Sequence, residues 1–92
     1  MTTQLIHYKG KVQGVGFRVM TLRLARGYEV AGYVKNLPTG EVELLIRGNE
    51  EEVALFLEAI REGELRGHIE EEKNLSLPPE VSNELFKGFM IR

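Results

Sequence analysis

Cysteine is absent from the 92 residues of this chain. Its absence excludes disulfide bonds, a thiolate nucleophile and cysteine-ligated metal sites. No apolar run approaches the roughly 20 residues that a helix needs to cross a bilayer. The opening residues also lack the charged segment and long apolar stretch of a secretory signal, so we expect a cytoplasmic protein.

The chain also has almost no net charge. The chain carries 12 Lys and Arg against 14 Asp and Glu, which gives a formal net charge of −2. This balance gives no reason to expect a nucleic acid or a membrane surface as partner, although it is compatible with a local cationic pocket. Linkers, low-complexity tracts and internal repeats are missing as well. We therefore expect one domain over residues 1–92.

Apolar and polar residues follow clear periods in the first half of the chain. Residues 3–12 alternate as expected for a β-strand, and a helical period begins at Phe17. The apolar positions of that helix are Phe17, Met20, Leu24 and Tyr28. Residues 30–36 and 41–47 alternate again, and residues 37–40 between them are turn formers. This pattern predicts a β-hairpin.

The second half begins with a strong helix start. Asn49 is a favourable N-cap, and the three glutamates after it lie where the helix dipole stabilises negative charge. The buried stripe of this helix is predicted to be Val53, Phe56, Leu57 and Ile60. Gly63 is expected to end the helix. Residues 68–77 then predict a less apolar strand, and residues 86–92 predict a short final strand.

The order strand, helix, strand, strand, helix, strand is typical of an α+β protein with the ferredoxin-like β-α-β-β-α-β sandwich. We expect an antiparallel sheet with two helices on one face and a short extra C-terminal strand. Residues 66–72 are unusually acidic, which indicates a solvated edge strand whose charges discourage pairing with another chain. This fold hosts many unrelated activities, so the function has to come from particular residues.

The most informative segment joins the first strand to the first helix and reads Gly10-Lys11-Val12-Gln13-Gly14-Val15-Gly16-Phe17-Arg18. Its glycines allow backbone N–H groups to converge on an anion at the start of the helix. Arg18 adds a charged, fork-shaped donor in the first helical turn. The segment matches neither the P-loop pattern nor the dinucleotide-binding pattern. From the residues alone, an anion cradle and an ordinary turn with a solvated arginine both remain open.

The same nine residues resemble the first signature of the acylphosphatase family at every defining position. A second signature of that family is similar to Gly32-Tyr33-Val34-Lys35-Asn36 with Gly40, Val42 and Gly48 after it. The ending Phe89-Met90-Ile91-Arg92 is also similar to the usual family ending. The resemblance is good from Gly10 to about Ile60 and at the last few residues, and its expected fold agrees with the strand order above.

This resemblance implies an acyl phosphate as substrate, inorganic phosphate as product, and no metal or cofactor. We also expect a monomer. The resemblance implies that Arg18 binds the phosphate and that Asn36 positions the attacking water. The backbone N–H groups that share the phosphate would come from the loop residues Gln13, Gly14, Val15, Gly16, Phe17 and Arg18. Taken alone, Asn36 would fit ordinary turn chemistry, because it precedes Leu37-Pro38-Thr39-Gly40.

Two alternatives to this interpretation remain open. One is a non-catalytic phosphate- or anion-binding module of the same fold, and the other is a module cut from a larger enzyme that handles carbamoyl phosphate. Aromatic residues of the sheet could also suggest a nucleic-acid platform, but the absence of a basic face argues against it. His7 and His68 show no ligand spacing and are expected to be incidental.

Overall fold

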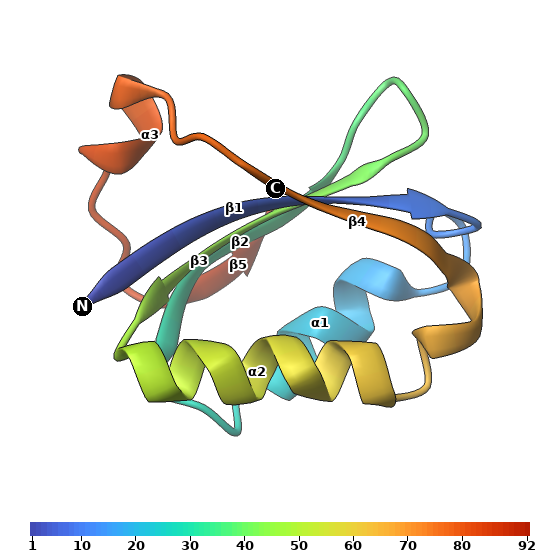
Figure 1. Cartoon of the computed structure of the whole chain (residues 1–92), viewed down its shortest axis with the longest axis horizontal. Helices are drawn as coiled ribbons and strands as arrows, with labels where there is room; N and C mark the ends of the chain where they lie inside the picture. Colours follow the sequence, from blue (N-terminus) through green and yellow to red (C-terminus); the bar gives the residue numbers. More distant parts are fainter.

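A computed structural model describes all 92 residues as a five-stranded sheet with helices on both faces (Figure 1). The elements in chain order are β1 (Thr2–Gly10), α1 (Phe17–Ala25), β2 (Val30–Asn36), β3 (Val42–Gly48), α2 (Glu50–Glu62), the 3-10 helix η1 (Arg66–His68), β4 (Ile69–Leu75), α3 (Pro79–Ser82) and β5 (Phe89–Ile91). The predicted β-α-β-β-α-β order with a short C-terminal strand is therefore confirmed.

The strands lie in the order β4-β1-β3-β2-β5. The pairs β1–β3, β1–β4 and β2–β3 are antiparallel, as expected for the ferredoxin-like arrangement. The extra strand β5 runs parallel to β2 and makes the sheet mixed rather than wholly antiparallel. The acidic strand β4 does lie at an edge, with Glu70 and Glu71 exposed, as its composition predicts.

Helices α1 and α2 cover one face of the sheet (Figure 1), and the main core fills the space between them. The N-cap prediction for α2 is confirmed, because Asn49 Oδ1 accepts a 2.9 Å hydrogen bond from the N–H of Glu51. The predicted stripe of α2 is buried in full. In α1, Phe17 is buried as expected, but Thr21 is buried as well. Its hydroxyl donates to the carbonyl of Phe17 at 2.7 Å, which removes the cost of burying it.

The opposite face of the sheet carries a second, smaller cluster made by Leu5, Tyr33 and Leu45. The segment around α3 packs over it with apolar side chains such as Phe86. Arg47 fastens this segment by donating to the backbone carbonyl of Ser82 at 3.1 Å and to that of Glu84. None of the helices combines the length and the apolar character that crossing a membrane requires.

Candidate active site

The loop between β1 and α1 depends on two glycines in the left-handed region of backbone space. Gly14 has φ of 77° and Gly16 has φ of 81°. A Cβ atom at either position would meet no heavy atom within 4 Å, so space is not the reason for glycine. The reason is conformational, because residues with a side chain rarely adopt such φ values. These two glycines allow the loop to bend sharply before the first turn of α1.

The N-terminus of α1 is arranged for an external anion. Gly16 is its N-cap and has no side chain to cap it, and the first turn holds no acidic residue. The first N–H groups of a helix have no partner within the helix, and they carry partial positive charge. Arg18 lies in this turn, where the dipole disfavours a cation by about 0.3–1 kcal/mol. A bound anion would reverse this penalty and engage the free N–H groups.

Arg18 and Asn36 line the same cavity, although they come from α1 and from the last residue of β2. The cavity has a volume of about 110 Å³. Its lining residues are Val12, Gly14, Gly16, Phe17, Arg18, Val19 and Asn36. Neither Arg18 nor Asn36 has an ion pair or a side-chain hydrogen bond within the protein. Both polar groups are therefore available to a ligand.

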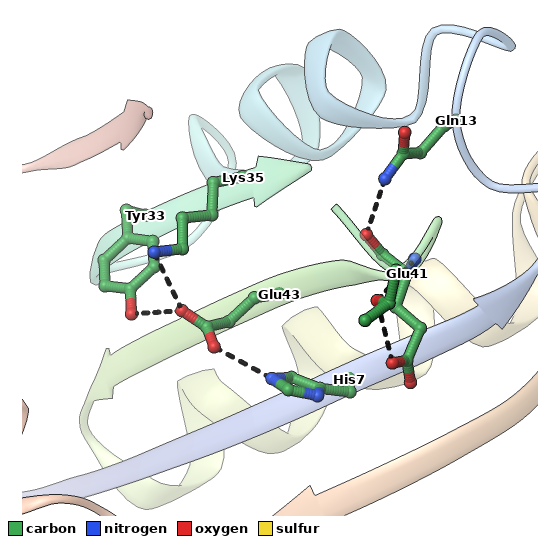
Figure 2. A network of polar contacts seen from close by, with 7 residues as sticks. His7, Gln13, Tyr33, Lys35, Glu41 and Glu43 are labelled. Atoms are coloured by element: carbon green, nitrogen blue, oxygen red, sulfur yellow. Dashed lines mark hydrogen bonds and ion pairs between the residues drawn. The ribbon is translucent and has the colours of Figure 1, made fainter. Parts of the chain in front are cut away.

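Two residues of the predicted phosphate loop do not line the cavity. Val15 is 39% exposed beside it. The side chain of Gln13 instead donates a 2.8 Å hydrogen bond to the carbonyl of Leu37. It donates a second one, also of 2.8 Å, to the carbonyl of Glu41 (Figure 2). These bonds tie the loop before α1 to the turn that follows Asn36. The Gln13 side chain thus helps to fix the distance between the loop before α1 and the end of β2.

A polar cluster on the other face of the sheet was not predicted from the sequence. Glu43 accepts hydrogen bonds from His7 at 2.8 Å and from the Tyr33 hydroxyl at 2.7 Å, and the ammonium of Lys35 lies 3.7 Å away (Figure 2). His7, which was not expected to act as a ligand, links β1 to β3 through its bond to Glu43. The structure contains no group of three or more His, Cys, Asp or Glu that could hold a metal ion.

The Glu43 cluster should make stability depend on pH. Burial opposes ionisation of Glu43, but hydrogen bonds from Tyr33 and His7 and the charge of Lys35 outweigh it and hold its pKa below 4.5. A depressed pKa stabilises the fold above the unfolded-state pKa, and this contribution disappears as pH falls through the folded-state pKa. Glu43→Gln should therefore lower the free energy of unfolding by about 1–2 kcal/mol at pH 7 and by less at pH 3.5. Urea denaturation at the two pH values measures this.

The matched control for this prediction is Glu58→Gln, because Glu58 is exposed on α2 and forms no ion pair. It should change stability by less than about 0.5 kcal/mol at either pH. A loss in Glu43→Gln that stayed equal at pH 7 and pH 3.5 would contradict the role given to the carboxylate charge.

Comparison with known proteins matches the acylphosphatase family model to residues 4–91. The acylphosphatase of Polaromonas naphthalenivorans is 36% identical over 75 residues, which span 82% of this chain and 74% of that protein. The crystal structure of acylphosphatase from Bacillus subtilis superposes with a TM-score of 0.82 at 32% identity, covering 100% of this chain and 99% of that one. T. kodakarensis HypF superposes with a TM-score of 0.83 at 30% identity, but this covers only 12% of its chain.

These likenesses agree with the geometry of the cavity and with both sequence signatures. They support acylphosphatase activity, and with it an acyl phosphate substrate and a phosphate product, and nothing among them favours the non-catalytic alternative. The family match includes the loop before α1, the hairpin that carries Asn36 and the C-terminal strand. The chain belongs to the acylphosphatase family.

Proposed function

We propose that this acylphosphatase works through the cavity at the start of α1, with Arg18 binding the phosphoryl group and Asn36 positioning water. The backbone N–H groups of residues 13–18 would share the phosphoryl oxygens with the Arg18 fork. The observation that carries the proposal is that Arg18 and Asn36, both without protein partners, line one cavity at an uncapped helix N-terminus.

The reaction needs little chemistry from the protein. The water oxygen forms a new bond to phosphorus while the bond from phosphorus to the acyl oxygen breaks. The carboxylate leaves with the electron pair of that bond, and a phosphoryl oxygen of the substrate accepts the proton of the water. Arg18 and the N–H groups compensate the charge on the phosphoryl oxygens. The Asn36 amide offers both a donor and an acceptor, which suits it to orient water without taking its proton.

We further propose that residues 1–92 act as one acylphosphatase-like domain and as a cytoplasmic monomer, with no nucleic acid or membrane as partner. One sheet that carries both hydrophobic clusters supports the single domain. A net charge of −2 supports the absence of a nucleic acid partner. Sedimentation at several protein concentrations would test the monomer.

Hydrolysis of benzoyl phosphate in the presence of a metal chelator tests the function directly. We expect turnover that the chelator does not reduce, because Arg18 and backbone N–H groups supply the positive charge. Inorganic phosphate should inhibit competitively, since it would occupy the same cavity. Phosphate binding without any turnover would instead support a non-catalytic anion-binding module. Turnover that disappeared with chelator and returned with a divalent cation would contradict the metal-independent mechanism.

A further inference from the structure

The cavity at the start of α1 is small. Its volume is about 110 Å³, whereas pockets that bury most of a drug-sized ligand commonly measure about 300–1,000 Å³. Since Arg18 and the helix N-terminus lie inside it, the phosphoryl group takes the interior. A large acyl group therefore extends toward the rim, where exposed side chains can contact it and favour some acyl groups over others.

Only one apolar side chain of the cavity lining reaches this rim. Val12 and Phe17 are 1% and 2% exposed, so the main core holds them almost completely. Val19 is 46% exposed and lines the cavity directly. The two lining glycines offer no side chain, and the other lining residues are Arg18 and Asn36. An apolar acyl group that leaves the cavity can thus gain buried area on Val19.

Valine is also an unfavourable residue for the exposed helix position that Val19 occupies. Exposed helix positions are usually filled by better helix formers, and β-branched valine loses side-chain freedom in a helix. Nearly half of its surface remains exposed, and the loop residue Val15 beside the cavity is similarly exposed. Single exposed apolar side chains are common, but this one faces a cavity that a ligand is expected to occupy.

We propose that Val19 is a specificity-determining residue that packs against the acyl group and favours apolar acyl phosphates over small ones. This inference rests on the proposed function of the cavity. Contact with the isopropyl group removes apolar surface from water in the bound state, and this gain grows with the size of the acyl group. Acetyl phosphate has one methyl group to place there, whereas benzoyl phosphate has an aromatic ring.

The test compares kcat/KM for benzoyl phosphate and acetyl phosphate in wild type, Val19→Thr and Val19→Ala. Threonine keeps the shape of valine but replaces a methyl group with a hydroxyl, and alanine keeps the helix while removing area. The ratio of benzoyl to acetyl kcat/KM should fall about threefold to tenfold in both variants, which is less than an enclosed pocket achieves. The two substrates have different leaving groups, but this does not affect the test. The kcat/KM of a variant for each substrate is compared with the wild-type kcat/KM for the same substrate.

The matched control is Leu55→Ala, which removes a 43% exposed apolar side chain from α2 outside the cavity. The substrate ratio should stay as in wild type. A general disturbance of α1 would reduce both substrates equally and leave the ratio unchanged, and that result in both Val19 variants would overturn the inference while the proposed function stands. Wild type that hydrolysed neither substrate would overturn the proposed function and the inference with it.

Discussion

Replacing Arg18 with alanine should lower kcat/KM for benzoyl phosphate by about a thousandfold or more. The substitution removes the one side-chain cation of the cavity and its two parallel donors. Each tenfold loss corresponds to about 1.4 kcal/mol of transition-state stabilisation, so the expected loss is about 4 kcal/mol. The inhibition constant of inorganic phosphate should rise as well, because ground-state binding uses the same contacts. Steady-state kinetics with benzoyl phosphate, with and without phosphate, measures both.

The stability of Arg18→Ala separates this role from a structural one. Arg18 has no ion pair and lies at the end of α1 that disfavours a cation, so its loss should leave the melting temperature unchanged or slightly higher. Arg18→Lys serves as the matched variant, since lysine keeps the charge but cannot form the bidentate contact. It should recover only a small part of the activity. Full activity in Arg18→Lys would show that charge alone suffices and would contradict the fork-shaped contact.

Local pattern was enough to predict the second helix and the hairpin. The start of α2 at Asn49 and its buried stripe follow from a capping residue and a helical period, which are local properties. The turn after Asn36 contains Gly40 with φ of 95°, a conformation that suits the glycine predicted there. Elements of this kind are predictable because neighbouring residues alone determine them.

Pairings between distant segments could not be predicted in the same way. The parallel contact of β5 with β2 depends on where the C-terminal segment meets the finished sheet. The burial of Thr21 depends on a hydroxyl that bonds one turn back along its own helix, and an apolar period does not mark it. The Lys35–Glu43 pair could have been predicted, because the hairpin turn sets which residues of β2 and β3 face each other. His7, however, lies 36 residues from Glu43 in the sequence. Only the register of β1 with β3 brings them together.

The residues of the candidate site also differ in how far local sequence predicts their roles. The glycines and Arg18 predict an anion cradle from local chemistry, since the loop and the helix N-terminus are adjacent in sequence. Asn36 gives no such signal alone, because an asparagine before a turn is commonplace. Resemblance to a family signature supplied its role as an expectation. The structure adds that β2 ends beside the first turn of α1, which places Asn36 and Arg18 on one cavity.

Asn36→Ala should lower kcat for benzoyl phosphate by about a hundredfold to a thousandfold while changing the inhibition constant of phosphate by less than about threefold. The amide acts on water rather than on the phosphoryl group, so substrate binding should survive its loss. The fold should survive too, because the side chain of Asn36 forms no hydrogen bond within the protein. Single-turnover kinetics and phosphate inhibition measure the two effects separately.

Asn36→Asp is the matched variant, because it keeps the shape and one acceptor but adds a negative charge beside the phosphoryl group. Repulsion should raise the inhibition constant of phosphate well above that of Asn36→Ala, which shows how near the side chain lies to the bound anion. If Asn36→Ala kept near-normal turnover, water would be positioned by another group. If it lost phosphate binding and turnover together, Asn36 would be a phosphate ligand like Arg18. Only a large loss of kcat with phosphate binding retained supports the division of labour between the two residues.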